Sequence, residues 1–108
     1  MPIPAKEGIY EIDGVLYVIG SRHIVKVAKA LANDTRAKII EKLLEGPRDL
    51  NELAEDVDQS KANISNQIRK LEEVSIVKSS YNPGHRGIKK YVELNVKKIV
   101  MVFEPEST

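Results

Sequence analysis

Residues 60–74, SKANISNQIRKLEEV, carry the pattern that decides the fold of this chain. A serine, which is a favoured helix N-cap, precedes apolar residues spaced by four, three and three positions: Ile64, Ile68, Leu71 and Val74. This spacing puts the apolar side chains in one stripe along an amphipathic helix. The other side carries small polar and cationic groups, which can hydrogen-bond to base edges and phosphate oxygens. The stretch is therefore predicted to be the recognition helix of a helix-turn-helix.

The short segment in front of this stretch predicts the first helix of the same motif. Asp49 is a suitable N-cap, and Glu52 three residues later completes a variant of the capping box. The core side of this helix is predicted to consist of Leu50, Leu53, Ala54 and Val57. Two helices joined by so short a turn, the second with a polar outer face, are typical of a helix-turn-helix.

Two longer helices are predicted further upstream. The first begins at Ser21 as its N-cap and runs to about Ala32. Its buried face follows helical spacing and consists of Ile24, Val27, Ala28 and Leu31. Since one side of this helix is apolar, it is expected to pack against the rest of the domain.

The second upstream helix is capped by Asn33 or Asp34 and runs to about Leu44. Its inward residues are predicted to be Ala37, Ile40, Leu43 and Leu44. Gly46-Pro47 ends the helix, because glycine permits a left-handed cap and proline cannot continue a helix.

Residues 76–94 are predicted to form a wing. Two strand-like runs, 76–82 and 88–94, flank a connection that Pro83-Gly84 and Gly87 mark as a loop. Basic side chains stand at its tip and on the returning strand: His85, Arg86, Lys89 and Lys90.

The N-terminal stretch 9–19, IYEIDGVLYVI, predicts a β-hairpin. Asp13-Gly14 between two β-rich runs is the preferred two-residue type I′ turn. In that register Ile12 lies opposite Val15, and Tyr10 lies opposite Tyr17 as a structural pair. The ribbon is apolar on both faces, so it is expected to be covered by the domain, by a second subunit, or by both.

The C-terminal segment allows two interpretations. Val96, Ile99, Val100 and Phe103 fit a helix capped by Asn95, while the β-branched residues of IVMVF also suit a strand. The helix is the preferred prediction. From Pro105 onward we expect a frayed tail.

The totals predict an ordinary soluble, cytoplasmic domain. At 108 residues, with 42% hydrophobic and 31% charged residues, the chain can bury a modest core. No apolar run approaches the roughly 18 residues that a membrane span needs, and no export signal opens the chain. Without cysteine it can form neither a disulfide nor a thiolate metal site.

Charge is unevenly distributed along the chain, although the net charge is only +1. Between residues 59 and 92 seven lysines and arginines oppose two glutamates, a local balance of 7 − 2 = +5. Just before them, residues 49–58 contain five acidic residues and no lysine or arginine. One basic and one acidic face are typical of a protein that binds a polyanion.

Residues 31–94 resemble the winged helix-turn-helix repressors of the ArsR type. That family typically reads L-A-x-x-T-R-x-x-I-L-x-x-L, then a short E-L-A helix, then S-x-x-x-x-S-x-x-L-x-x-L-x-x-x-x-L-V before the wing. The matching residues are Leu31-Ala32, Thr35-Arg36, Ile39, Leu43, Glu52-Leu53-Ala54, Ser60, Ser65, Ile68, Leu71 and Ile76-Val77. The resemblance covers roughly 60% of the chain and implies the winged fold, although MarR-type regulators share much of the pattern.

Two departures from the family limit what the resemblance implies. Metal-sensing members carry cysteines before the recognition helix or Asp/His clusters on the last helix. This chain has no cysteine, and His23 and His85 are isolated, so no metal site is predicted. The N-terminal hairpin lies outside the usual pattern, and it or residues 95–103 would then form the dimer contact.

The predicted fold is α+β, mainly α: a winged helix-turn-helix with an added N-terminal β-hairpin. Residues 1–20 would form the hairpin, 21–94 the DNA-binding domain, and 95–108 a dimer contact with a tail. In the interface, side chains predicted to approach base edges are Lys61, Ala62, Asn63 and Asn66, and those predicted to hold phosphates are Ser60, Ser65, Arg69 and Lys70. The wing would add His85, Arg86 in a minor groove, and Lys89 and Lys90 on the backbone.

These features favour a sequence-specific double-stranded DNA-binding transcription regulator. Acting as a homodimer, it would place two recognition helices in major grooves about 34 Å apart. Two alternatives remain open: a winged protein-interaction adaptor, and a nucleoid protein with little sequence preference. No catalytic constellation, cofactor motif or membrane partner is predicted, and the sequence names no effector.

Overall fold

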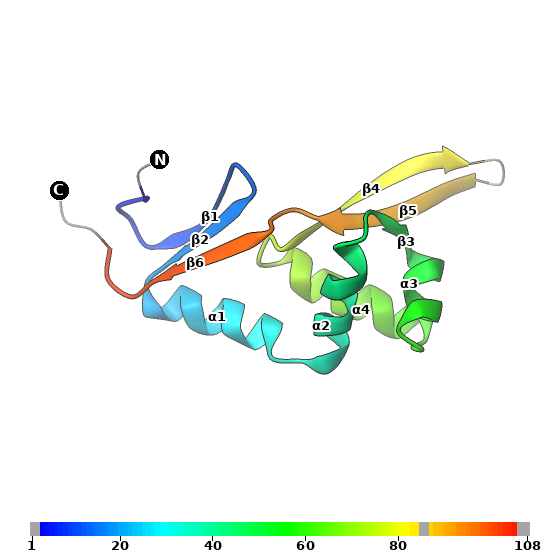
Figure 1. Cartoon of the computed structure of the whole chain (residues 1–108), viewed down its shortest axis with the longest axis horizontal. Coiled ribbons are helices and arrows are strands. Elements are labelled where there is room, and N and C mark those ends of the chain that lie inside the picture. Colours follow the sequence, from blue (N-terminus) through cyan, green and yellow to red (C-terminus); the bar gives the residue numbers. More distant parts are fainter. Residues whose placement is uncertain (1–2, 85–86, 106–108) are drawn as a thin grey trace.

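The computed structural model describes residues 3–84 and 87–105. In this part of the chain, four helices and two three-stranded sheets form an elongated molecule, 53 Å along its longest axis, with the sheets at opposite ends (Figure 1). The elements are β1 (Gly8–Ile12), β2 (Val15–Ile19), α1 (Ser21–Leu31), α2 (Asp34–Leu43), β3 (Arg48–Asp49), α3 (Leu50–Asp56), α4 (Lys61–Glu72), β4 (Val77–Gly84), β5 (Gly87–Leu94) and β6 (Lys98–Val102). The predicted α+β winged helix-turn-helix with an N-terminal hairpin is confirmed.

The helix-turn-helix consists of α3 and α4, and both helices begin where the sequence predicts. The carboxylate of Asp49 accepts a hydrogen bond from the backbone N–H of Glu52 at 2.9 Å, and the Ser60 hydroxyl accepts one from Asn63 at 3.1 Å. Each cap satisfies a backbone donor that has no partner within its own helix. The predicted core sides of both helices are buried.

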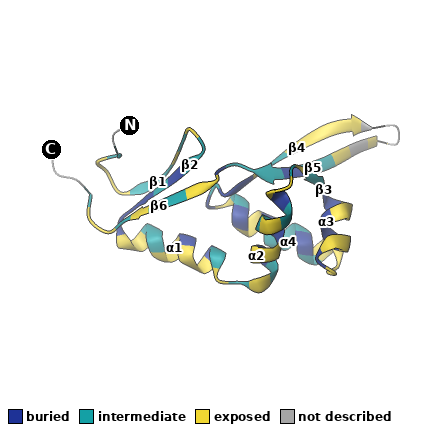
Figure 2. Cartoon of the chain, in the orientation of Figure 1, coloured by how far each residue is buried: buried dark blue, intermediate teal, exposed yellow. Residues whose placement is uncertain are grey.

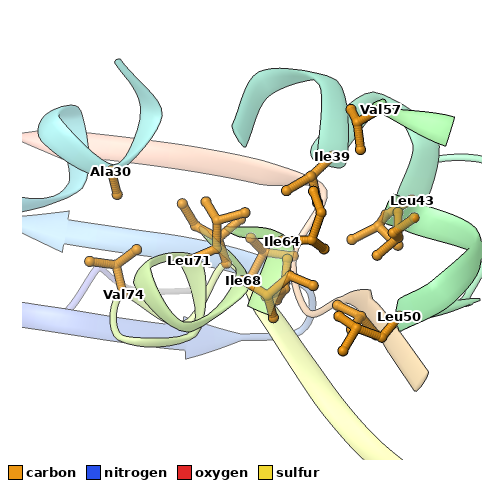
Figure 3. Packing of buried hydrophobic residues seen from close by; sticks show 14 of the residues in the cluster. Ala30, Ile39, Leu43, Leu50, Val57, Ile64, Ile68, Leu71 and Val74 are labelled. Carbon is orange, nitrogen blue, oxygen red and sulfur yellow. The ribbon is translucent and has the colours of Figure 1, made fainter. Parts of the chain in front are cut away.

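The hydrophobic core forms where α4 meets α2 and α3. Side chains from these helices converge on the inner face of α4, together with Ala30 of α1 (Figure 3). Ile64, Ile68 and Leu71 are fully buried in this cluster. Because the inner face of α4 is held by this packing, its outer face has a fixed orientation relative to the wing.

The buried face of α2 differs from the prediction. Ile39 is fully buried beside Leu43, whereas Ala37 is exposed and Leu44 is 64% exposed. The sequence IIEKLL offers two apolar stripes offset by one residue, and packing of α2 against α4 selects the stripe of Ile39 and Leu43. The N-cap of α2 is Asn33, whose side chain accepts a hydrogen bond from the Arg36 backbone N–H at 3.0 Å.

The prediction that Ser21 caps α1 is wrong by one residue. Gly20 is the N-cap, with a φ of 98°, and Ser21 is already helical. The Gly20 N–H donates to the Val102 carbonyl of β6 at 2.8 Å, while its own carbonyl accepts from Ile24 at 3.0 Å. The positive φ at this junction of sheet and helix is a conformation that favours glycine.

The hairpin of β1 and β2 has the predicted register. Ile12 pairs with Val15 and Tyr10 pairs with Tyr17, and both turn residues, Asp13 and Gly14, have positive φ values of 51° and 78°. These angles are those of the type I′ turn. Helix α1 packs against β2 (Figure 1), and Leu16 and Val18 are buried in one cluster with Val27 of α1.

The preferred helix for residues 95–103 is wrong, because Lys98–Val102 form strand β6. This strand runs parallel to β2, with partners from Val15↔Lys98 to Ile19↔Val102, and completes the sheet order β1-β2-β6. Pairing with β2 satisfies backbone groups along one edge and lets Ile99 pack against the core. We call β1, β2 and β6 the terminal sheet.

The wing is formed by β4 and β5, and β3 completes its sheet in the order β3-β5-β4. The strands pair from Val77↔Leu94 to Gly84↔Gly87, so they run longer than predicted toward the tip. His85 and Arg86, the predicted tip cations, lie outside the described residues. The outer half of the wing is mostly exposed (Figure 2).

Candidate nucleic-acid interface

Helix α4 and its N-cap carry the side chains that are predicted to form its DNA contacts. Those at its N-terminal end are Ser60, Lys61 and Ala62, all exposed, followed by Asn63, Ser65 and Asn66, which are half-buried. Arg69 and Lys70 are exposed in the last turns. Because Ile64, Ile68 and Leu71 fix the opposite face, these groups stand side by side on one surface.

Asn63 is held by a hydrogen-bonded chain that begins in the core. Its amide nitrogen donates to Gln59 Oε1 at 2.7 Å, and its amide oxygen accepts from Gln67 Nε2 at 3.3 Å. Gln67 Oε1 in turn accepts from Arg36 Nη1 at 2.5 Å. These hydrogen bonds restrain the Asn63 amide before any ligand binds. Gln67, near the core side of α4, links Asn63 to Arg36 and so supports the orientation of this amide.

Arg36 is a buried cation and was not among the predicted site residues. Its Nε donates to the Ala30 carbonyl at 2.5 Å and its Nη2 to the Lys29 carbonyl at 3.1 Å. These carbonyls belong to the last turn of α1, where carbonyl groups lack partners within the helix and the helix dipole favours a positive charge. Arg36 therefore caps α1 and supports Gln67 with the same guanidinium group.

A second pair on α4 joins a predicted base-reading residue to a predicted phosphate contact. Arg69 Nη2 donates to Asn66 Oδ1 at 2.5 Å. The bond restrains the Asn66 amide and draws the guanidinium of Arg69 toward the polar surface. Both asparagines on this face are thus oriented by neighbouring side chains.

The wing cations lie close to acidic groups of the helices. Lys89 Nζ is 3.9 Å from Asp49 Oδ2, and Lys90 Nζ is 3.8 Å from Glu72 Oε1. Lys89, Lys90 and Lys61 also line one recess of about 170 Å³ between the wing and the start of α4. The structure therefore brings together the recognition helix and the wing lysines, and the acidic partners position these lysines beside α4.

Replacing Asp49 by alanine is expected to lower the free energy of unfolding by about 1–2 kcal/mol, because the change removes the α3 cap and the partner of Lys89. Asp49→Asn keeps an oxygen for the cap and removes only the charge. Its loss is expected to stay at about 0.5 kcal/mol, because Lys89 is largely exposed and the ion pair is long. Urea denaturation of the three proteins measures both values. Equal losses for the two variants would contradict a capping role.

The same fold occurs in known regulators. Residues 33–79 match the family described as bacterial regulatory protein, arsR family. This segment is therefore similar to the ArsR family. The match covers α2, α3, α4 and the start of the wing, and leaves the terminal sheet outside the ArsR-family segment.

Individual regulators are similar to this chain over part of its length. An uncharacterized HTH-type transcriptional regulator of Methanocaldococcus jannaschii is 36% identical over 56 residues, which are 52% of this chain and 59% of that protein. The crystal structure of Rv0081 from M. tuberculosis is similar with a TM-score of 0.61 and 25% identity, over 69% of this chain and 72% of that one. A homodimeric winged helix-turn-helix DNA-binding domain from Mycobacterium bovis is similar with a TM-score of 0.59 and 24% identity, over 67% and 63% of the two chains.

The described residues hold neither a candidate metal site nor a candidate membrane span. Among residues 3–84 and 87–105, no three histidine, cysteine or acidic side chains are grouped as metal ligands would be. Within the same ranges, no helix has the length and apolar character needed to cross a bilayer.

Proposed function

We propose that this protein is a sequence-specific transcription regulator that binds double-stranded DNA as a homodimer. Helix α4 enters the major groove, and the wing contacts the flanking backbone or minor groove. The observation that carries the proposal is the outer face of α4, on which Asn63 and Asn66 are oriented by hydrogen bonds to neighbouring side chains. An asparagine amide presents the donor and acceptor pair that matches adenine in the major groove.

Restraint of these amides supports a sequence-reading role rather than general attraction to DNA. A side chain already held near its bound orientation loses less conformational entropy on binding. By contrast, three wing lysines lie near carboxylates, at Lys78–Glu93, Lys89–Asp49 and Lys90–Glu72. These carboxylates offset the field that a low-specificity nucleoid protein would depend on. The ArsR-family match and the DNA-binding M. bovis domain support the same proposal.

The proposal predicts that alanine at Asn63 or Asn66 weakens binding to the specific site by about 5- to 150-fold each, the effect of losing one bidentate base contact. Binding to random duplex should change little. The measurement is a fluorescence-anisotropy titration with a site selected from random duplexes and with random genomic duplex, each at two salt concentrations.

Two further variants separate base reading from other effects. Lys70→Ala is expected to weaken binding to both duplexes alike and to reduce the salt slope by about one unit, as the loss of a phosphate contact does. Gln59→Ala removes one hydrogen bond of Asn63 and leaves the asparagine in place, so it tests whether restraint alone matters. Equal salt-sensitive binding of both duplexes would instead favour a nucleoid protein, and no binding at low salt would favour a protein-interaction adaptor.

A further inference from the structure

One edge of β6 has no partner among the described strands. The Val102 carbonyl accepts from Gly20 N–H next to β2, so the backbone groups of Val102 face β2. Successive residues of a strand direct their backbone groups to opposite edges. The N–H and C=O groups of Ile99 and Met101 therefore face outward. An unpaired edge of this kind is a template for pairing with another strand.

The sequence around Met101 makes this edge of β6 complementary to the same edge of a second copy. An antiparallel pair of β6 strands related by a two-fold axis at Met101 would join Met101 to its own copy as a hydrogen-bonded pair. The same register places Lys98 opposite Glu104 and Ile99 opposite Phe103. Lys98 and Glu104 are both exposed in the single chain. Shifting the two-fold axis to another residue of β6 removes the pairing of Lys98 with Glu104.

An apolar groove lies where this register would place the partner's phenylalanine. Ile99 lines the groove together with Leu31, Ile40 and Leu44, and its volume is about 140 Å³. A cavity of roughly 150 Å³ with a similar apolar lining accepts a benzene ring. Phe103 is 79% exposed in the single chain, directly after β6. In this register the exposed Phe103 ring of each copy lies opposite the unfilled groove beside Ile99 of the other copy, and the two fit each other.

We propose that the homodimer forms through the outer edges of two β6 strands, which join two terminal sheets into one sheet of six strands. Phe103 and Glu104, which form a bend after β6 in the single chain, continue the strand in this pair. Each Phe103 ring then occupies the groove beside Ile99 of the other copy. The inference rests on the homodimer of the proposed function and names its interface. It assigns a role to the terminal sheet, which the ArsR-family segment does not include.

The absence of cysteine from the chain allows a direct test by cross-linking. In this pairing the two Met101 Cα atoms lie about 5.5 Å apart, within the range of roughly 4.4–6.8 Å that a disulfide spans. Met101→Cys is therefore expected to form a disulfide-linked dimer on mild oxidation, seen on a non-reducing gel. Tyr81→Cys, on the exposed wing, is the matched control and is expected to stay monomeric on that gel.

Sedimentation equilibrium of the unmodified chain distinguishes failure of the interface from failure of the homodimer. A dimer that cross-links through Val25→Cys on α1 but not through Met101→Cys would overturn the β6 interface and leave the homodimer standing. A chain that sediments as a monomer at tens of micromolar would overturn both. Each of these cysteine variants changes an exposed side chain, so all three are expected to fold.

Charge exchange gives a second, independent measurement. Lys98→Glu and Glu104→Lys each place like charges opposite one another and are expected to raise the dimer dissociation constant by at least about tenfold. The double variant restores opposite charges and is expected to recover the original constant. Phe103→Ala is expected to raise the constant by a similar factor through loss of the buried ring. Additive losses in the double variant would overturn the register.

Discussion

Replacing Arg36 by alanine is expected to lower the free energy of unfolding by about 3–5 kcal/mol, through the loss of hydrogen bonds from a charged donor and the cavity that is left. The guanidinium donates to the carbonyls of Lys29 and Ala30 and to Gln67, and alanine leaves all three acceptors without this donor. A cavity remains as well, because the side chain is buried. Urea denaturation monitored by circular dichroism gives the value.

Two control variants separate this role from the simple loss of a positive charge. Arg36→Lys keeps the charge but cannot supply three donors in a planar fork, so it is expected to recover only part of the loss. Arg22→Ala removes an exposed arginine from α1 and is expected to change stability by less than about 0.5 kcal/mol. A loss at Arg36 no larger than that at Arg22 would show that the α1 carbonyls are satisfied without it.

The helix-turn-helix could be predicted from the sequence because its signals are local. Capping residues at Asp49 and Ser60 and the apolar stripe of α4 lie within one or two helical turns of the structures that they define. The Asp13-Gly14 turn is local in the same sense, since two adjacent residues set the register of the hairpin. In each case the interaction that decides the structure joins residues close in the chain.

The two main errors arose where a distant partner decides between local alternatives. Residues 98–102 carry apolar residues that suit a helix or a strand, and pairing with β2, some 80 residues earlier, selects the strand. In α2 the local sequence predicts burial of Ile39 with Leu43 as well as it predicts burial of Ile40 with Leu44. Contact with α4 buries the first, and Leu44 becomes part of the groove beside β6.

The positions of the candidate interface residues on α4 could be predicted, but the contacts that hold them could not. Periodicity alone places Asn63 and Asn66 on the outer face of α4. The chain from Arg36 through Gln67 to Asn63 joins residues of α2 and α4, and the proximity of Lys89 to Asp49 joins the wing to α3. The Thr35-Arg36 match to the ArsR pattern was the signal in the sequence that pointed to Arg36, and nothing local indicated its burial.

A variant unable to dimerise is expected to bind an operator with two half-sites about 10²–10⁴-fold more weakly than the unmodified protein. In the dimer, binding of one α4 holds the second near its half-site at a high effective concentration, and a monomer lacks this advantage. Met101→Lys combined with Phe103→Ala is the suitable variant, because it places two lysines together at the two-fold axis and empties both grooves. Anisotropy titration at a protein concentration where the unmodified chain is dimeric gives the two affinities.

A duplex with a single half-site shows whether the loss comes from dimerisation or from damage to α4. On this duplex the variant and the unmodified protein are expected to bind within about threefold of one another, because one recognition helix contacts the DNA in both cases. Residues 101 and 103 lie in the terminal sheet region, at the opposite end of the molecule from the wing (Figure 1), so the interface on α4 is unchanged. A variant that sediments as a monomer yet keeps full affinity for two half-sites would show that each copy binds DNA independently. Dimerisation through β6 thus predicts a loss of DNA affinity only on the duplex with two half-sites. Damage to α4 predicts the same loss of affinity on both duplexes.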